Sequence, residues 1–551
     1  MKLRSLFKRF LYAILITGIL TISIISCNKQ LHTAPINSTY GAEFWTSQNS
    51  VEEATVAMYG QLRAGLRGAM ATDQGESSYF VFGDLVAALF SPAGGDTFLP
   101  YGLSETPVVS TKPWNFSYTP YWEPDLQNWS RFYQVIALCN LILQNVPQMN
   151  ASLFQSSDQR KSYLAEALFV RAYTYFTITR IWGDPVYVSK SYNDVDYGNV
   201  PPVPRSPEAA VLDSCIKDLH FASATLDFSG SDPTKTIRAN RGSVDALMAH
   251  IFEWQHQYDS AHYYCQEIIN NGGYSLEPMS NYLNIWKGQS SNESIFEMPM
   301  QYNANDPNFK NGGNWQEATF NCFAGFLKGP IIDNQRTSSW IAPTGTFIDY
   351  KDPTVQTRDS IPATTLFDTV KDARTKVALQ FVTASGGDPA GYMLMKYTNF
   401  NYQSPDTKSF PYINNDLVLF RLADIYLLDA EALAYKGDLI GAAQDLSFTE
   451  KRAGINTYRR PTNKFDMQEE VIKERGRELI GEGQWFYDLI RNENTPDGTH
   501  THTWLELIGY PADRVSPQNK GYYWPLDMNT LFPYDNLLLQ NLWWTNHAGR
   551  Y

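Results

Sequence analysis

Three glutamates near the C-terminus are spaced for one face of a helix. Glu474, Glu478 and Glu482 lie at i, i+4 and i+8, and side chains at this spacing share one side of a helix. Paired carboxylates are the catalytic groups of most glycoside hydrolases. Three arginines are close in the sequence, namely Arg475, Arg477 and Arg491. Because a network of ion pairs explains the same glutamates, we interpret them as structural and predict no catalytic residue.

The sequence offers little for metal or nucleophilic chemistry. His250, His256 and His262 lie at i, i+6 and i+12, a spacing that drifts around a helix axis. The pair His500 and His502 is more typical of a solvated turn than of a metal site, which needs three or four ligands. No GxSxG, HExxH or phosphate-loop motif occurs. We therefore expect no metal and no cofactor.

Two segments are rich in aromatic residues. The first, 79–122, contains Tyr79, Phe80, Phe82, Phe90, Phe98, Tyr101, Trp114, Phe116, Tyr118, Tyr121 and Trp122. The second, 302–347, contains Tyr302, Phe309, Trp315, Phe320, Phe323, Phe326, Trp340 and Phe347. Asn and Asp residues are interleaved with the rings. For any single ring, packing in the protein's own core is the favoured interpretation.

As a group, the two aromatic segments are predicted to include some ligand contacts. Flat aromatic faces stack on the apolar C–H faces of sugar rings, while Asn and Asp side chains satisfy the hydroxyls. A peptide binder could use the same side chains. Loops on a rigid scaffold are where binding surfaces arise. The candidate ligand-binding residues are Asp96, Trp114, Trp122, Tyr302, Trp315 and Trp340.

Most of the remaining chain has the apolar periodicity of helices. A first helix begins near Thr46, and further helices are predicted over 130–146, 159–182, 207–226, 241–256, 259–270, 416–436, 439–453, 467–482 and 484–491. Between 272 and 415 the helical period fades, and Gly, Asn, Pro, Thr and aromatic residues dominate. Because this stretch is too long for plain loop in a compact domain, we expect an irregular substructure with short strands there.

Two helical hairpins share one pattern of small and large residues. The pattern is formed by Ala249, Phe252, His256, Tyr258 and Ala261, and again by Ala430, Leu433, Gly437, Leu439 and Ala442. It resembles part of the tetratricopeptide pattern, in which small residues let two antiparallel helices approach. The predicted fold class is therefore mainly α: a scaffold of tetratricopeptide-like helical hairpins with a large irregular, loop-rich subdomain that contains short strands.

The N-terminus is typical of an export signal that ends at a cysteine. Four positive charges precede an apolar run from Phe10 to Ile25, which is short for a spanning helix of about 20 residues. The sequence Ile24-Ile25-Ser26-Cys27 resembles a bacterial lipobox. We expect residues 1–26 to be removed, Cys27 to be lipidated and 27–45 to form a tether, so that acyl chains hold the protein to a membrane.

The overall composition excludes several classes of protein. Of the 551 residues 18% are charged and 43% hydrophobic, which argues against a disordered chain. The formal charge of −13, or −17 once residues 1–26 are removed, argues against nucleic-acid binding. The four other cysteines are Cys139, Cys215, Cys265 and Cys322. They lack metal spacing, and although export permits disulfides, we favour isolated buried thiols.

Several motifs together resemble the SusD/RagB family of outer-membrane lipoproteins, which serve nutrient uptake. The motifs are Glu166-Ala167-Leu168-Phe169-Val170-Arg171-Ala172-Tyr173, Trp182-Gly183-Asp184-Pro185-Val186, Arg421-Leu422-Ala423-Asp424, Lys451-Arg452-Ala453-Gly454-Ile455, Glu474-Arg475-Gly476-Arg477-Glu478-Leu479 with Glu482-Gly483, Asp488-Leu489-Ile490-Arg491, Tyr523-Trp524-Pro525-Leu526 and Asn536-Leu537-Leu538-Leu539-Gln540-Asn541. Their order and separations hold over nearly the whole mature chain. Where the family usually has Arg two residues after the Glu-Gly pair, this chain has Trp485, which weakens one ion pair.

The resemblance implies an organisation and a function. It implies a helical region 46–271 with an aromatic loop insert at 72–128, an irregular ligand-facing region 272–415 and a C-terminal helical region 416–551. It implies a non-enzymatic lipoprotein on the outer membrane that captures an oligosaccharide and delivers it to a SusC-type TonB-dependent transporter. The helical repeats would supply the surface that faces this partner.

Some alternatives stay open at the level of sequence. A peptide-binding member of the same family, a surface glycoside hydrolase and a periplasmic scaffold are all compatible with parts of the pattern. Display on the outer face is expected from the family, but the tether gives it no support, since Asn28-Lys29-Gln30-Leu31 lacks the acidic residues often found after the lipidated cysteine.

Overall fold

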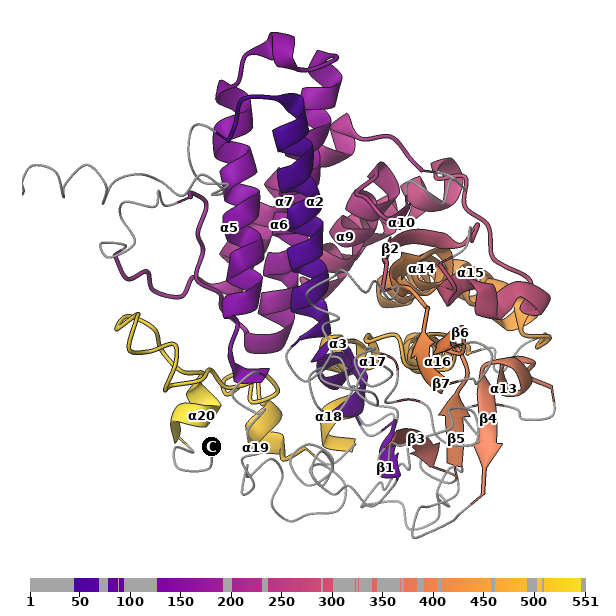
Figure 1. Ribbon diagram of the computed structural model, residues 1–551. Coiled ribbons are helices and arrows are strands. Elements are labelled where there is room, and N and C mark those ends of the chain that lie inside the picture. The colour runs from indigo at the N-terminus through magenta and orange to yellow at the C-terminus, as the bar shows by residue number, and fades with distance from the viewer. Residues whose placement is uncertain are drawn as a thin grey trace, which may run out of the picture.

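Four long helices stand side by side at one end of the molecule (Figure 1). The computed structural model describes residues 44–68, 78–87, 89–93, 126–191, 201–229, 236–288, 291–300, 323, 326, 339–343, 367, 371–383, 391–404, 409–456, 461–492, 503–507 and 510–546. The four helices are α2 (Gln48–Arg67), α5 (Ser130–Asn145), α6 (Ser157–Trp182) and α7 (Glu208–Thr225). The predicted helices 130–146, 159–182 and 207–226 are confirmed to within two residues at each end.

Helix α6 is the centre of this group, which explains its composition. It packs against α2, α5 and α7, and every side chain from Phe169 to Trp182 is buried. This C-terminal half of α6 is therefore covered on all sides, and its side chains form no solvent-facing polar stripe. The N-cap of α6 is Ser156, whose side chain accepts a hydrogen bond from the amide of Gln159. Its C-cap is Gly183, whose φ of +77° is strained for a residue with a Cβ but not for glycine.

A second group of helices lies beside the first and is built from hairpins. Its helices are α9 (Arg241–Trp254), α10 (Tyr258–Asn271), α14 (Leu422–Lys436), α15 (Leu439–Arg452), α16 (Lys464–Glu478) and α17 (Trp485–Arg491). Hairpins α9–α10 and α14–α15 pack together through α10 and α14 (Figure 1). The small residues Ala249, Ala261, Ala430 and Ala442 have no exposed surface. Both predicted hairpins are confirmed.

The structure corrects two of the predicted helix boundaries. The expected helix 416–436 begins as a strand, β8 (Leu417–Arg421), before α14 starts. All five residues of β8 are buried, and such a continuous apolar run fits a buried strand as well as a helix. The expected helix 467–482 ends at Glu478, because Gly481 and Gly483 adopt φ angles of +71° and +75°.

The region predicted to be irregular does contain short strands. A four-stranded antiparallel sheet has the order β1–β3–β5–β4, formed by β1 (Ser91–Ala93), β3 (Ser339–Pro343), β4 (Leu379–Val382) and β5 (Gly391–Leu394). Two further pairs are β2 (Ser294–Met298) with β8, and β6 (Phe400–Ser404) with β7 (Ser409–Ile413). A 3₁₀ helix, η7 (Met279–Trp286), and a short helix, α13 (Arg374–Val377), complete its described part.

The described parts of the aromatic insert and of the tail contain short helices. In the insert, α3 (Ser78–Phe80) runs directly into a π-helical turn, η2 (Val81–Leu85). Short 3₁₀ turns η4 (Val146–Gln148) and η5 (Ala151–Leu153) follow α5. The described part of the tail after α17 contains α18 (Trp504–Leu507), α19 (Ala512–Val515) and α20 (Leu542–Asn546). None of the helices in the described ranges is both long and apolar enough to cross a bilayer.

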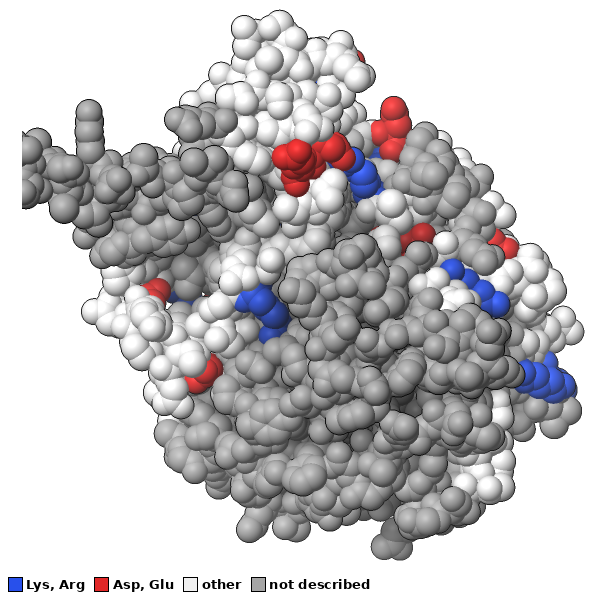
Figure 2. All heavy atoms as spheres, in the orientation of Figure 1, with Lys and Arg blue, Asp and Glu red and all other residues white. Residues whose placement is uncertain are grey.

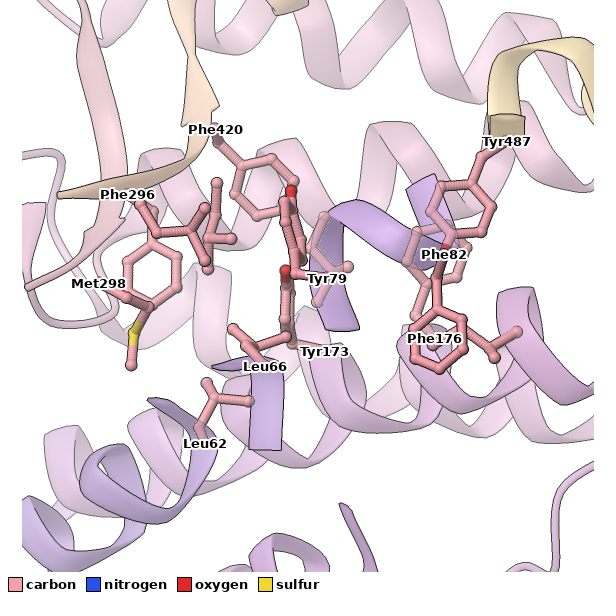
Figure 3. Packing of buried hydrophobic residues seen from close by; sticks show 14 of the residues in the cluster. Leu62, Leu66, Tyr79, Phe82, Tyr173, Phe176, Phe296, Met298, Phe420 and Tyr487 are labelled. Atoms are coloured by element: carbon pink, nitrogen blue, oxygen red, sulfur yellow. The ribbon is translucent and has the colours of Figure 1, made fainter. Parts of the chain in front are cut away.

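Aromatic rings join the two helical groups in one core. Figure 3 shows Tyr173 of α6 facing Phe296 of β2 and Phe420 of β8, with ring centroids 6.5 and 6.0 Å away. The predicted helical motif around Tyr173 is therefore a packing motif. Cys139, Cys215 and Cys265 are buried free thiols, as predicted, and Cys322 lies outside the described residues.

Candidate functional site

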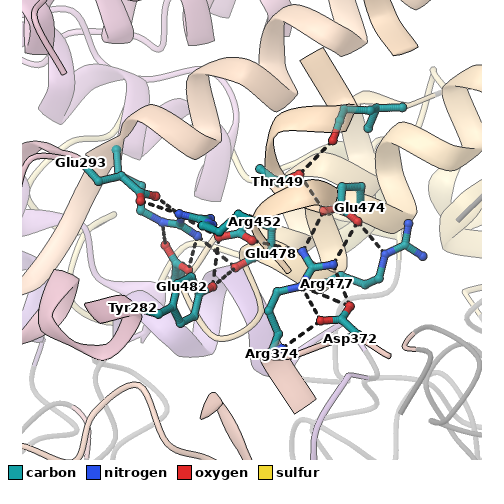
Figure 4. A network of polar contacts seen from close by, with 12 residues as sticks. Tyr282, Glu293, Asp372, Arg374, Thr449, Arg452, Glu474, Arg477, Glu478 and Glu482 are labelled. Carbon is teal, nitrogen blue, oxygen red and sulfur yellow. Dashed lines mark hydrogen bonds and ion pairs between the residues drawn. The ribbon is translucent and has the colours of Figure 1, made fainter. Parts of the chain in front are cut away.

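Glu478, the last residue of α16, lies in a cluster of arginines (Figure 4). Its carboxylate forms ion pairs with Arg421 at 2.8 Å, with Arg374 at 3.1 Å and with Arg452. Burial alone would raise the pKa of Glu478, but the positive charges of Arg452, Arg421 and Arg374 outweigh it and hold this pKa below its usual range. Because its carboxylate is enclosed and paired with three arginines, Glu478 is a structural residue.

The two neighbouring glutamates are held in the same way. Glu474 accepts hydrogen bonds from Arg374, Arg477 and Thr449, each at 2.7 Å. Glu482, on the turn after α16, pairs with Arg421 at 2.7 Å and with Lys396. Glu474 and Glu478 have no exposed surface and Glu482 has 5%. The predicted ion-pair network is confirmed, and no substrate can reach these carboxylates in the folded chain.

Arg475 and Arg491, which we expected in that network, belong to a second one. Arg475 pairs with Asp424 and Asp488 at 2.9 and 2.8 Å, and Arg491 pairs with Asp488 and Glu431. Asp424 and Glu431 lie on α14 and Asp488 on α17. The second network therefore ties α14, α16 and α17 together. Within the described ranges, no group of His, Cys, Asp and Glu is arranged to hold a metal ion.

Trp485 has a structural role of its own in place of the family's arginine. Its ring lies against Gly476 of α16, where an added Cβ would be 2.8 Å from ring atom Cζ3. Position 476 must be glycine, because a side chain there would collide with the ring of Trp485.

The described aromatic residues of the two predicted segments are core residues. They are Tyr79, Phe80, Phe82, Phe90, Phe323 and Phe326, and none is more than 7% exposed. Phe80 of the first segment contacts Phe326 of the second with ring centroids 4.9 Å apart, and Phe323 stacks on Tyr397 at 4.3 Å. For these rings the core interpretation is confirmed. The contact of Phe80 with Phe326 joins the first aromatic segment to the second.

The sheet brings the same two segments together a second time. Strand β1 of the first segment pairs with β3 of the second, so that Ala93 lies opposite Ser339. Ala93 is followed in the sequence by the rest of the first segment, and Ser339 is preceded by most of the second segment. Two stretches more than 200 residues apart in sequence therefore meet at one edge of the sheet, as a shared ligand surface would require.

The structure places one of the six candidate ligand-binding residues. Trp340 lies in β3, where its backbone is opposite Pro92, while its side chain is outside the described part. The other five candidates, Asp96, Trp114, Trp122, Tyr302 and Trp315, lie outside the described residues, and so does Cys27. Their roles remain predictions.

An aromatic pair with one exposed ring, Phe381, and one half-buried ring, Tyr392, lies on the same sheet and was not predicted. Phe381 of β4 lies opposite Tyr392 of β5, with ring centroids 5.4 Å apart and planes at 67°. Phe381 is 50% exposed, although large apolar side chains on a sheet are usually covered. Tyr392 also lies opposite Ala342, two residues after Trp340. Sequence reasoning missed the pair because each ring stands alone in its segment.

Motifs that are far apart in the sequence also meet in space. The amide of Trp524 donates to the carbonyl of Ile181 at 2.8 Å, and the side-chain amide of Asn541 donates to the carbonyls of Trp182 and Trp524 at 3.1 and 2.8 Å. Tyr523 covers Gly183, where an added Cβ would be 2.8 Å from the ring. The motifs at 182–186, 523–526 and 536–541 thus form one structural unit.

Paired helical hairpins, together with a small sheet that joins the two aromatic segments, define a helical-repeat protein. Comparison with known proteins agrees. A family model described as "Starch-binding associating with outer membrane" matches residues 108–252, and one described as "SusD family" matches 383–543. The chain belongs to the SusD/RagB family.

Relatives and solved structures cover nearly the whole chain. SusD-like protein P38 of Formosa agariphila is 23% identical over 85% of this chain and 88% of its own length. A SusD homolog from Bacteroides thetaiotaomicron superposes with a TM-score of 0.67 at 23% identity, over 91% of this chain and 99% of its own. A laminarin-binding SusD-like protein gives 0.64 at 21%, over 90% and 99%. The fold is thus a mainly α, SusD-like fold.

Proposed function

We propose that this protein is a glycan-binding lipoprotein of the outer membrane, which captures an oligosaccharide and delivers it to a SusC-type TonB-dependent transporter. The observation that carries the proposal is the meeting of both aromatic segments at β1 and β3, on the sheet that also carries the exposed ring of Phe381 against the half-buried Tyr392. The laminarin-binding relative in structure supports a glycan as the ligand class.

The chemistry of capture needs no reacting group. Rings at the sheet edge stack on the apolar faces of pyranose units, and Asp96 with nearby asparagines accepts and donates hydrogen bonds to the hydroxyls. The buried contacts of Phe80 with Phe323 and Phe326 support this proposal, because they join described residues of the two aromatic segments.

The lipid anchor explains how capture leads to uptake. Acyl chains on Cys27 hold the protein in the membrane that also contains the transporter. Confinement to a surface raises the effective concentration of the bound glycan at the transporter entrance. The acidic mature chain binds no nucleic acid in this proposal. Its loops recognise the glycan alone.

Calorimetric titration of the mature chain, residues 28–551, tests the proposal. Laminarin, starch and a panel of other soluble polysaccharides are compared with a mixture of peptides. We expect heat from at least one glycan and none from peptides. Binding of peptides alone would replace the glycan proposal by the peptide alternative. Release of reducing ends from a bound polysaccharide would contradict the absence of catalysis.

A matched pair of variants shows which surface binds the glycan. Phe381→Ala removes the exposed ring of the pair, and we expect it to weaken binding about tenfold, since stacking on an aromatic ring contributes about 1 kcal/mol or more. Phe221→Ala is the control, because Phe221 is similarly exposed, at 42%, but lies on α7. Equal affinities of the two variants would exclude the sheet as the binding surface.

A further inference from the structure

The first aromatic segment begins with a π-helical turn that carries a buried acid. The turn η2 follows α3 directly, and we name these residues, 78–85, the root of the segment. Asp84 in the root has no exposed surface. π-helical turns are rare and occur frequently at functional sites. Because strand β1 comes shortly after the root in the sequence, the placement of the root affects the sheet edge at which the two aromatic segments meet.

Two side chains bond the root to the turn that follows α16. This turn covers residues 479–484, and we name it the glycine turn. Asp84 accepts a hydrogen bond from the amide of Gly483 at 2.6 Å, and the hydroxyl of Tyr79 donates to the carbonyl of Glu482 at 3.0 Å. These bonds therefore join the first aromatic segment to the C-terminal helical region.

The backbones of the root and the glycine turn touch at a pair of glycines. A Cβ added to Gly83 would be 2.1 Å from the carbonyl oxygen of Gly483, and one added to Gly483 would be 2.2 Å from atom Cε1 of Tyr79. A side chain at either position would collide with the opposite chain. This close approach brings the carboxyl of Asp84 within reach of the amide of Gly483.

The carboxyl of Asp84 lies in an unfavourable place for a negative charge. Burial, together with the charge of Glu482, raises the pKa of Asp84 to about 8, although the backbone of Gly483 and the ammonium of Lys396 favour ionisation. The second carboxyl oxygen of Asp84, Oδ1, forms no hydrogen bond with any described residue. An ionised Asp84 is therefore costly in the root, whereas a neutral one is not.

Lys396 makes the contact between the root and the glycine turn more sensitive to pH. Burial lowers the pKa of Lys396 to about 8, although its ion pair with Glu482 acts in the opposite direction. As the pH rises toward 8, Asp84 gains a negative charge while Lys396 loses its positive one. Glu482 still has Arg421 as a partner at 2.7 Å, so the unbalanced charge is that of Asp84.

The other charged and titratable groups that face the root do not change charge in this range. They are Tyr79 of α3, Tyr487 of α17, Arg180 of α6 and Arg131 of α5, whose guanidinium lies 5.9 Å from the ring of Phe82. Burial raises the pKa of both tyrosines, and guanidinium groups stay protonated. Figure 2 shows only small, separate groups of Lys, Arg, Asp and Glu among the described residues of this face, and exposed groups of these types keep their charge between pH 6 and 8.

We propose that Asp84 is a positioning residue of the ligand surface, which holds the root on the glycine turn while its carboxyl is neutral and releases it when the carboxyl ionises. The inference rests on the proposed function, in which the sheet edge of β1 and β3 contributes to glycan binding. Release of the root lets β1 leave its place beside β3. Glycan affinity therefore falls as the pH rises, although Asp84 itself touches no ligand.

The pH dependence of glycan affinity tests this role. The mature chain, residues 28–551, is titrated calorimetrically at pH 6 and pH 8.5 with laminarin, or with the neutral glycan of the panel that gives the most heat. We expect the wild type to bind about tenfold more weakly at pH 8.5, since one group can change an equilibrium by at most about tenfold per pH unit. Asp84→Asn, whose amide oxygen still accepts from Gly483 but does not titrate, should lose less than about threefold. Equal losses in the two proteins would overturn the role of Asp84.

Asp445→Asn is the matched control for titration. Burial raises the pKa of Asp445 to about 8 as well, but this residue lies on α15. The variant should keep the wild-type pH profile of glycan affinity. A flattened profile in Asp445→Asn would show that general stability, and not the root, sets the affinity, and the inference would then be wrong.

Gly83→Ala tests the contact without any titration. Because its Cβ would collide with Gly483, the root cannot dock, and we expect glycan binding about tenfold weaker than in the wild type at pH 6. Gly60→Ala is the control, since a Cβ added there on α2 meets no described atom within 4 Å. It should bind like the wild type. Wild-type affinity in Gly83→Ala would contradict the need for a docked root.

Hydrogen exchange of residues 79–87 gives a readout that needs no ligand. In the wild type, the protection factor of this stretch relative to that of α6 should fall about tenfold between pH 6 and pH 8.5, and it should stay nearly constant in Asp84→Asn. Constant protection in the wild type would overturn the release of the root. By contrast, a wild-type chain that loses this protection but binds no glycan at either pH would count against the proposed function and not against the role of Asp84 in the root.

Discussion

His256 and Gly437 occupy equivalent turns of two helical hairpins, and both have a positive φ angle, +58° and +85°. In each turn the following backbone amide donates to the carbonyl five residues earlier, that of Phe252 at 2.8 Å and that of Leu433 at 2.9 Å. These bonds satisfy carbonyls that the end of a helix leaves without a partner. The two hairpins thus share their turn geometry as well as their pattern of small residues.

The shared turn predicts the effect of exchanging its residue. A side chain in the left-handed region is strained, whereas glycine is not. We expect His256→Gly to raise the free energy of unfolding by about 0.5–1 kcal/mol, and His256→Val to lower it, because a β-branched residue fits this region least. Urea denaturation measures both. A His256→Gly protein that is less stable than the wild type would show that the stacking of His256 on Tyr258 outweighs the strain.

The helical scaffold was predictable because its signals are local. Periodicity, the glycine stop at Gly183 and the small residues of the hairpins each depend on a few neighbouring positions, and the structure confirms them. Strand β8 was missed because Leu417-Val418-Leu419-Phe420 is apolar at every position and has no period. Only its pairing with β2, over 100 residues away, decides between strand and helix.

The candidate site was less predictable because its relationships are not local. No spacing in the sequence indicates that Ala93 lies opposite Ser339, or that Phe381 faces Tyr392. The type of an aromatic residue also does not reveal whether it is buried, as Phe80 and Phe323 show. The ion-pair network was predicted from three glutamates, but its main partners, Arg374 and Arg421, come from other segments.

The arginine cluster predicts a large effect at Glu478. Glu478→Gln leaves three buried guanidinium groups without their shared negative charge, and breaking one side of a buried ion pair costs about 3–5 kcal/mol. We expect a loss of about that size in the free energy of unfolding. Asp158→Asn, which removes an exposed ion pair with Lys161, should change it by less than about 1 kcal/mol. Equal effects of the two variants would contradict the structural role of Glu478.

Asp84 predicts how stability depends on pH. Burial raises the pKa of Asp84 to about 8, although the amide of Gly483 donates to it at 2.6 Å. The folded chain therefore keeps a proton that the unfolded chain loses near pH 4, and stability falls as the pH rises toward 8. Between pH 6 and 8 we expect a loss of about 2 kcal/mol from this group.

Comparison with Asp84→Asn isolates this contribution. The amide oxygen of Asn still accepts from Gly483 but does not titrate, so the variant should lose less stability than the wild type between pH 6 and 8. Other buried acids with raised pKa values, such as Asp416 and Asp445, affect both proteins equally. Parallel pH profiles of unfolding for the two proteins would show that Asp84 is ionised in the folded chain.

The buried cysteines predict slow thiol chemistry. Burial raises the pKa of the thiols of Cys139, Cys215 and Cys265, and the thiolate is the reactive form. In the mature chain without Cys27, we expect an aromatic disulfide reagent to label at most Cys322 before unfolding and all four cysteines afterwards. Rapid labelling of Cys139, Cys215 or Cys265 in the native protein would contradict their burial.

Two kinds of aromatic residue should separate by experiment. Phe323 has no exposed surface and stacks on Tyr397, so Phe323→Ala should lower the free energy of unfolding by about 3–5 kcal/mol. Trp315 is one of the proposed ligand contacts, so Trp315→Ala should leave unfolding within about 0.5 kcal/mol of the wild type and weaken glycan binding about tenfold.

Calorimetric titration and urea denaturation of the same two variants provide the measurement. Phe323→Ala should bind glycan weakly only where part of the protein is unfolded. At low temperature, where its folded fraction is high, its glycan affinity should approach that of the wild type, because the ring touches no ligand. Trp315→Ala should remain weak at every temperature. If Trp315→Ala unfolds as easily as Phe323→Ala while its folded form binds glycan normally, Trp315 is a core residue, and the ligand contacts lie among the other aromatic residues of the two segments.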